Sequence, residues 1–178
     1  MMVDRFKYPI GVFRKPESIT TEQLNSCINN IQSFPQLLTN EVSSLTKEQL
    51  DTPYRHDGWT IRQVVHHCAD SHMNSFIRFK LALTEETPTI KPYHEDRWAE
   101  LSDANTFPIE HSLTLLDGLH ARWVALLTSL QTSDLKKTFI HPQNGEEICL
   151  DQNIVLYAWH CNHHLAHITS LKKRKGWK

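Results

Sequence analysis

Glycine is scarce in this sequence, with five residues in 178, and neither a low-complexity tract nor a repeat of fixed period is present. Without a flexible linker to divide the chain, we expect one domain spanning residues 1–178, large enough to bury a continuous apolar core. No run of 18 uncharged apolar residues occurs, and the N-terminal MMVDRFKYPIGVF lacks the apolar centre of a signal peptide. These absences predict a cytoplasmic protein with no membrane partner.

An excess of charge of either sign is also missing. The sequence has 19 basic and 20 acidic residues, a formal net charge of -1, so no overall field would attract nucleic acid or anionic lipid. We therefore expect no nucleic-acid partner. The cysteines form no CxxC pair, which favours buried, reduced thiols over a disulfide framework; they are Cys27, Cys68, Cys149 and Cys161.

Apolar residues recur at helical spacing in four long segments. Threonine and glutamine in the Thr-x-x-Gln form of a capping box stand at Thr20, Thr46 and Thr60. Pro35 inside the first segment predicts a kink or break near Phe34, because proline lacks the N–H for an internal hydrogen bond. Four amphipathic helices predict an all-α four-helix bundle. They are expected over residues 20–45, 60–83, 109–130 and 151–175, with a short helical turn after Thr46.

The segments between these helices carry different signals. Residues 85–107 have prolines at their borders and no clear period, which predicts a long loop with a turn around Trp98. Between residues 138 and 150, two short apolar segments flank Asn144-Gly145, a dipeptide suited to a two-residue turn. A small β-hairpin is expected there.

Four of the 12 histidines fall within eight positions of the last predicted helix: His160, His163, His164 and His167. On a helical wheel of about 100 degrees per residue, His164 and His160 lie roughly 60 and 100 degrees from the core-facing centre, and His167 and His163 roughly 120 and 160 degrees. His160 and His164 are one turn apart on the inner flank. They can therefore converge on one ion, as paired histidines do in helical zinc sites.

The helix over residues 60–83 supplies the third candidate ligand. His67 lies roughly 100 degrees from the core centre of that helix, which matches the offset of His160. We therefore predict a metal site formed by His67, His160 and His164. Asp70 follows His67 by three residues and is a candidate to orient a ligand or to accept a proton, with an exposed helical carboxylate as an equal alternative.

The remaining histidines and two cysteines receive other roles. His163 and His167 are expected to be exposed or to orient a ligand, and His66 to lie at the surface or in an interface. His72 lies on the core side of its helix and is interpreted as a hydrogen-bonded interior residue. Core packing is expected of Cys68 and Cys161. Five histidines show no pattern: His56, His94, His111, His120 and His141.

Two long strings carry a resemblance that is more specific than the histidine spacing. Residues 50–93 read LDTPYR-DGWT-RQVVHH-ADSHMN- and continue into RFKL-LTEETP-I-PY, and residues 159–169 read WH--HH-AHIT. With these strings the chain resembles, over nearly its whole length, the DinB-like superfamily of metal-binding four-helix bundles. The resemblance implies a homodimer and one divalent ion per subunit, zinc or nickel with zinc favoured, held by His67, His160 and His164 with waters.

Three functions fit these features. Three neutral imidazoles leave a zinc ion its charge and open positions, which is typical of catalytic sites, and the family is described as metal-dependent hydrolases. The leading hypothesis is hydrolysis of a small molecule by water activated at the ion, with Asp70 or His163 as proton acceptor, although the HExxH glutamate of one hydrolase class is missing.

The first alternative is a metal-dependent thiol S-transferase that uses bacillithiol or a similar low-molecular-weight thiol, as the resemblance to transferases of the superfamily implies. Arg55, Arg62 or Arg78 would then hold the carboxylates of the thiol. The second alternative is a helical binding protein whose ion is structural.

Overall fold

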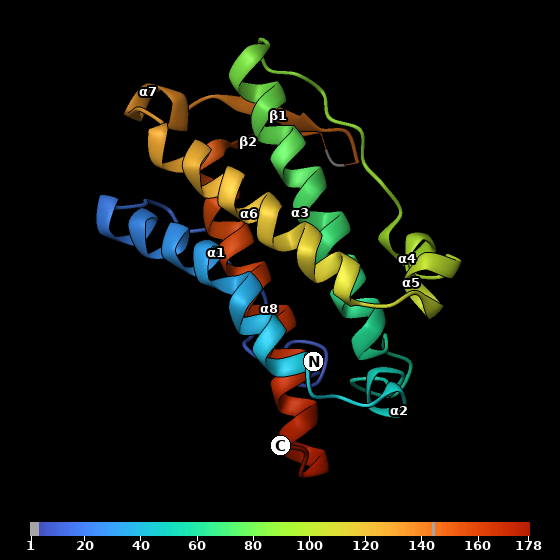
Figure 1. The fold of residues 1–178 in the computed structure, drawn as a ribbon. Coiled ribbons are helices and arrows are strands. Elements are labelled where there is room, and N and C mark those ends of the chain that lie inside the picture. Colours follow the sequence, from blue (N-terminus) through green and yellow to red (C-terminus); the bar gives the residue numbers. More distant parts are fainter. Residues whose placement is uncertain (1–3, 144) are drawn as a thin grey trace.

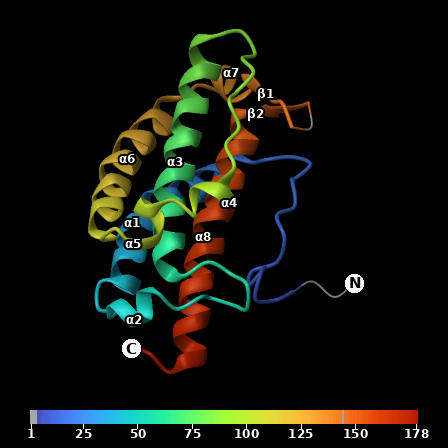
Figure 2. The ribbon, with the colours of Figure 1, turned by 90° about the vertical axis from the view of Figure 1, so that its right-hand side faces the viewer.

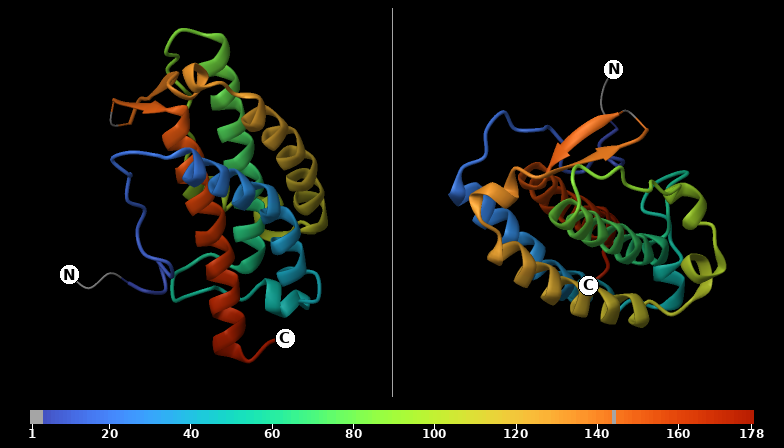
Figure 3. Two further views of the ribbon diagram at one scale, coloured as in Figure 1. Left: turned by 90° about the vertical axis from the view of Figure 1, so that its left-hand side faces the viewer. Right: turned by 90° about the horizontal axis from the view of Figure 1, so that it is seen from above.

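The computed structural model describes residues 4–143 and 145–178, which contain four long helices (Figure 1). They are α1 (Thr21–Val42), α3 (Ile61–Thr84), α6 (Glu110–Ser129) and α8 (Leu150–Lys175). Helix α1 packs on both α6 and α8. Helix α3 also packs on both α6 and α8. Seen from above, α1 and α6 form one layer and α3 and α8 the other (Figure 3). The all-α bundle predicted from the sequence is confirmed.

Shorter elements connect the long helices. They are α2 (Lys47–Leu50), α4 (Glu95–Trp98), α5 (Ser102–Thr106), α7 (Thr132–Leu135), β1 (Thr138–His141) and β2 (Glu146–Cys149). β1 and β2 pair antiparallel, with Phe139 opposite Ile148, so the expected hairpin is confirmed. Asn144 of its predicted turn lies outside the described residues. The expected loop over residues 85–107 contains two short helices, of which α4 ends at Trp98.

Capping boxes begin three helices where the sequence predicts them. At Thr20, Thr46 and Thr60 the threonine hydroxyl accepts a hydrogen bond from the backbone N–H of the glutamine three residues later. The side chain of that glutamine accepts one from the backbone N–H of the threonine. Two donors that a helix leaves unpaired at its start are thereby satisfied. The box at Thr60 fixes the start of α3, the helix that carries His67.

Pro35 does not break α1, which continues to Val42. Proline lacks an N–H, so the carbonyl of Ile31, four residues earlier, receives no hydrogen bond from within the helix. That carbonyl accepts a hydrogen bond from Nδ1 of His120 in α6 instead, at 2.6 Å. A side chain of the neighbouring helix therefore replaces the bond that proline removes.

Aromatic and aliphatic side chains from all four long helices fill the centre of the bundle. The largest fully buried ones include Trp123, Phe34, Phe79 and Ile154. Among the described residues, no helix is long and apolar enough to cross a membrane. The N-terminal segment runs along the outer side of α8 before it enters α1 (Figure 2). This position lets the segment cover side chains of α8 that the bundle alone would leave exposed.

Removal of the cap at Thr60 tests how α3 is anchored. We expect Thr60→Ala to lower the free energy of unfolding of the metal-free protein by about 1 kcal/mol, because the N–H of Gln63 loses its acceptor. Chemical denaturation measures this change. The matched control is Thr114→Ala: Thr114 is an exposed threonine whose hydroxyl donates within α6 to the carbonyl of Glu110. This control should change the free energy of unfolding by less than about 0.5 kcal/mol. Equal effects of the two substitutions would contradict a specific capping role.

Candidate metal centre

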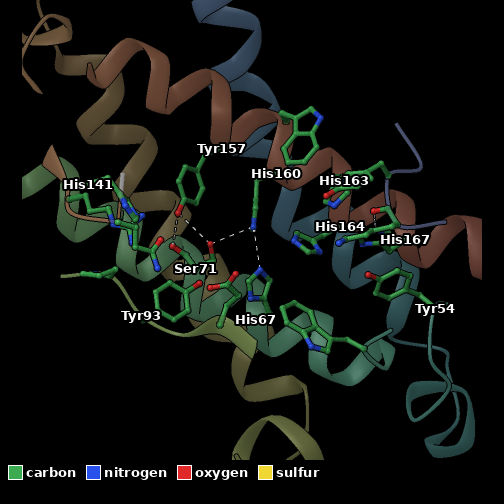
Figure 4. A pocket seen from close by; sticks show the side chains of 18 residues that line it. Tyr54, His67, Ser71, Tyr93, His141, Tyr157, His160, His163, His164 and His167 are labelled. Carbon is green, nitrogen blue, oxygen red and sulfur yellow. Dashed lines mark hydrogen bonds between the residues drawn. The ribbon is translucent and has the colours of Figure 1, made fainter. Parts of the chain in front are cut away.

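The three predicted ligands meet where α3 packs on α8. His67 comes from α3, and His160 and His164 lie one turn apart on α8 (Figure 4). One ligand nitrogen from each ring lies within 4.8 Å of the others. The Nε2 atoms of His67 and His160 are 3.3 Å apart. A tetrahedral ion with bonds of about 2.0–2.1 Å separates its ligand nitrogens by roughly 3.3 Å, so this pair has the spacing of two ligands.

Burial keeps these imidazoles uncharged. Loss of water, with a smaller contribution from His163 and His167, lowers the pKa of His67 to about 3. The same two causes hold the pKa values of His160 and His164 well below the usual range. A neutral imidazole has a free lone pair, which is the form that binds a metal ion. The site therefore needs to release few protons when it takes up a cation.

The donor set fits a divalent ion of intermediate softness. Three imidazoles suit zinc and nickel, as they also suit copper and iron. Nδ1 of His164 is buried and has no hydrogen-bond partner among the described residues. A buried polar atom without a partner costs free energy, and a bound ion with its waters would supply a partner and remove that cost. The residues present are thus compatible with a metal centre.

His163 and His167 are buried, so exposure, the first of their two expected roles, is wrong, and orientation of a ligand stays a prediction. Their exposed fractions are 7% and 2%. Trp159 stacks on His163 with ring centroids 4.4 Å apart, and Tyr54 stacks on His167 at 3.9 Å. Nε2 of His167 donates a hydrogen bond to the carbonyl of Lys7 at 3.0 Å. The wheel treats the outer side of α8 as solvent, whereas the N-terminal segment and the loop before α3 cover it.

The two candidate proton acceptors differ in position. His163 lines the same cavity as the three predicted ligands, and burial lowers its pKa to about 4, with a further contribution from His167. Asp70 is not among the described residues that line this cavity. Burial raises the pKa of Asp70 to about 6, and the negative charge of Asp103 in α5 adds to the shift. Asp70 is therefore close enough to α5 for the charge of Asp103 to affect it, and it lies outside the lining of the cavity.

A cavity of about 440 Å³ opens beside the histidines, and its wall includes hydroxyl groups that the sequence analysis did not single out. Ser71 Oγ lies 3.5 Å from Nε2 of His160 and 3.3 Å from the hydroxyl of Tyr157 (Figure 4). Tyr93 also lines the cavity, and burial raises the pKa of its hydroxyl. Ser71 follows His67 by one helical turn, so the spacing alone could have identified it. Tyr93 lies in a segment without periodicity, and no sequence signal marks it.

The interior histidine His72 is confirmed, with an exposed fraction of 0%. His66 is also buried, so of its two expected places the surface is wrong, and a place in an interface stays a prediction. Nδ1 of His66 lies 2.8 Å from Ser112 Oγ, and Nε2 lies 3.1 Å from the carbonyl of Phe107. The start of α6 and the residues before it cover this side of α3.

The cysteines and arginines can be placed in the same way. Cys68 and Cys161 are buried in the core as predicted, whereas Cys27 and Cys149 are only half-buried, so the expected burial of these two is wrong. All four cysteines lie within the described residues and are free thiols. Arg62 is buried and pairs with Asp51 at 2.7 Å. Of the three arginines considered for anion binding, Arg78 alone belongs to the described lining of the cavity.

Known proteins with similar sequences and structures cover nearly all of the chain. A family model described as the DinB superfamily matches residues 31–168. Proteins named "Putative metal-dependent hydrolase" from Oceanobacillus iheyensis and Bacillus cereus are each 57% identical over 171 residues, which is 96% of this chain and 98% of the relative. YfiT from Bacillus subtilis has a solved structure, described as a probable metal-dependent hydrolase with an unusual four-helix bundle topology. It is 52% identical with a TM-score of 0.95, over 98% of this chain and 99% of that one.

The burial of neutral histidines predicts a loss of stability in acid. In the folded protein, burial lowers the pKa of His120 to about 4, and the pKa values of His163 and His167 fall to about 4 as well. An unfolded histidine has a pKa near 6.5. Between about pH 6.5 and pH 4 the unfolded chain binds protons that the folded chain does not. Each of these groups therefore costs up to about 1.4 kcal/mol of stability per pH unit as the pH falls.

Chemical denaturation of metal-free protein between about pH 7 and about pH 5 measures this loss. We expect the free energy of unfolding to decrease steadily below about pH 6.5. A free energy that stays constant over this range would contradict the burial of uncharged imidazoles.

Proposed function

This chain belongs to the DinB superfamily, and we propose that it is a metal-dependent hydrolase of a small molecule in which His67, His160 and His164 hold one divalent ion. The proposal rests on one observation: three buried or half-buried imidazoles from two helices place their ligand nitrogens within 4.8 Å of one another at the wall of a cavity. The names of the relatives support the reaction class. We favour zinc, with nickel as the alternative.

The side chains around the three imidazoles determine how a substrate would be held. When bound, a divalent ion supplies positive charge that acidifies a water molecule and polarises the bond to be cleaved. The hydroxyls of Ser71, Tyr157 and Tyr93 offer hydrogen bonds to polar atoms of a substrate in the cavity. A volume of about 440 Å³ is in the range of small-molecule pockets.

The proposed active site also includes a residue that accepts a proton and two tryptophans that shield the histidines from water. His163 is the better candidate acceptor, because it lines the cavity and its buried Nδ1 has no hydrogen-bond partner in the described part of the chain. Asp70 is the weaker candidate, because it is not among the described residues that line the cavity. Trp59 lies over His67 with ring centroids 4.6 Å apart and, with Trp159, shields the rings from water.

Metal content and turnover test the proposal together. We expect purified protein to bind one equivalent of zinc and to hydrolyse at least one member of an ester, amide and phosphate panel. We expect His160→Ala to lose both properties. The matched control is His66→Gln, which changes a buried histidine of α3 that lies near Ser112 and Phe107 and outside the predicted ligand set. The control should keep both properties, and a His160→Ala protein with full metal content would exclude the proposed ligand set.

The same preparation separates hydrolysis from thiol transfer. The observation that favours transfer is Arg78, whose guanidinium lines the cavity and has an Nε that is buried without a partner among the described residues. Such a group suits a carboxylate of a thiol such as bacillithiol. Metal-loaded protein is incubated with bacillithiol and a chromogenic electrophile. Turnover that requires the thiol, with no hydrolysis of the panel, would replace the hydrolase with an S-transferase.

We also propose a homodimer and a cytoplasmic location. The resemblance to the family supports the dimer, and the free thiols fit a reducing compartment. Light scattering at micromolar concentration should give twice the mass of one chain. A mass equal to that of one chain over the same concentrations would exclude the dimer.

A further inference from the structure

Three histidines form a continuous hydrogen-bonded chain from α1 to the candidate metal centre. Nδ1 of His120 lies 2.6 Å from the carbonyl oxygen of Ile31. Nε2 of His120 lies 2.8 Å from Nδ1 of His72, and Nε2 of His72 lies 3.0 Å from Nδ1 of His160. The chain thus joins three helices in the order α1, α6, α3 and ends on α8. Both ring nitrogens of His72 and of His120 are used in it.

The Ile31 carbonyl gives this chain a direction. A carbonyl oxygen can only accept, so Nδ1 of His120 carries the hydrogen. A neutral imidazole has one N–H, so Nε2 of His120 must accept, and Nδ1 of His72 must donate to it. The same rule makes Nε2 of His72 an acceptor for the N–H at Nδ1 of His160. Nε2 of His160 is then left with a free lone pair.

That lone pair faces the other predicted ligands. Nε2 of His160 is the atom that lies 3.3 Å from Nε2 of His67. With the opposite tautomer, a hydrogen on Nε2 of His160 would occupy the position of an ion between the two rings. The orientation of the hydrogen-bonded chain therefore decides whether His160 presents a ligand atom or a proton to the centre.

Pro35 explains why the chain begins at Ile31. In an uninterrupted helix the Ile31 carbonyl would accept from the N–H of residue 35, but proline has none. The unpaired carbonyl is buried with Ile31 and needs a donor. Nδ1 of His120 supplies it, so a feature of the α1 sequence fixes the tautomer of a histidine in α6.

The interior position of the chain removes competing partners. The exposed fractions of His72 and His120 are 0% and 2%. The ring of Phe34 lies 5.2 Å from that of His72, and the ring of Trp123 lies 5.6 Å from that of His120. The phenyl ring of Phe34 offers no hydrogen-bonding group, and the indole N–H of Trp123 makes no hydrogen bond to either histidine. Neither ring therefore reverses the order of donors and acceptors.

From this geometry we propose that His120 and His72 are positioning residues, which carry the direction set by the Ile31 carbonyl to His160 and keep Nε2 of His160 free for the metal ion. The inference rests on the proposed ligand set and adds two residues that do not touch the ion. Metal-binding histidines commonly donate their second N–H to an acceptor, and loss of such an acceptor typically weakens metal binding by about 10- to 100-fold. Here the acceptor is itself a histidine with its own fixed orientation.

Nitrogen-15 NMR of the metal-free, full-length protein tests the direction itself, because two-bond correlations identify which ring nitrogen carries the hydrogen. We expect Nδ1–H on His120, His72 and His160. A hydrogen on Nε2 of His160 would overturn the proposal. This measurement needs no substrate and no variant, so it can fail or succeed whether or not the protein is a hydrolase.

Variants test the effect on metal binding. His120→Phe keeps an aromatic ring but removes the start of the chain, although residue 120 does not contact the proposed ligands. We expect a mixture of tautomers at His160 and a zinc affinity at least about tenfold weaker in a competition assay with a chelator. His72→Phe should have the same effect. His72→Gln, which can accept at a position close to Nε2, should restore part of the affinity.

The matched control is His66→Phe, which removes a histidine of similar burial in α3 that lies outside the chain. It should lower stability without changing zinc affinity or the tautomer of His160. If His120→Phe binds zinc as tightly as the unmodified protein, the positioning role is excluded. If the unmodified protein binds zinc tightly and hydrolyses nothing, the proposed function fails while the positioning role stands.

Discussion

Burial of uncharged imidazoles between α3 and α8 is the constraint that organises this structure. A buried imidazole has two nitrogens, and each must find a partner or cost free energy. In the bundle those partners are supplied by other histidines, by carbonyl groups and by hydroxyls. His66 forms hydrogen bonds with the Ser112 hydroxyl and the Phe107 carbonyl, and His167 donates to the Lys7 carbonyl. His120 and His72 are bonded to each other, and His120 donates to the Ile31 carbonyl. In the described part of the chain, Nδ1 of His163, His164 and His167 has no such partner. One ligand nitrogen from each of His67, His160 and His164 lies within 4.8 Å of the others, and these nitrogens define the candidate metal centre.

The need for partners at each buried imidazole also explains why α8 carries four closely spaced histidines. The i and i+4 pair His160 and His164 faces α3, while His163 and His167 face the cover formed by Trp159, Tyr54 and the N-terminal segment. An aromatic stack on each outer ring excludes water from the outer side of the site. Lower water content strengthens the interaction between an ion and whatever neutral or negative group binds to it.

Much of this could be predicted from the sequence because it depends on short-range patterns. Capping boxes at Thr20, Thr46 and Thr60 and the 3.6-residue period give the helices. The similar offsets of His67 and His160 from their core centres indicate a shared site. The burial of His66, His163 and His167 could not be predicted in this way, since a helical wheel describes one helix and not the segments that cover it. His120 shows no pattern for the same reason: its role depends on Pro35, which lies 85 positions away in the sequence and in a different helix.

The apolar core and the candidate metal centre are formed by different residues, which indicates whether the ion is needed for folding. Phe34, Phe79, Trp123 and the aliphatic residues around them form a core to which all four long helices contribute. A core of this kind stabilises the bundle by burial of apolar surface and does not need a cation to hold its helices together. Small domains that depend on a structural ion lack such a core and unfold without the metal. Here the protein already fixes the orientation of His160 through hydrogen bonds within that core. We therefore infer that the histidines are arranged before an ion arrives, and that the binding energy of the ion is available for chemistry at the cavity instead of for folding.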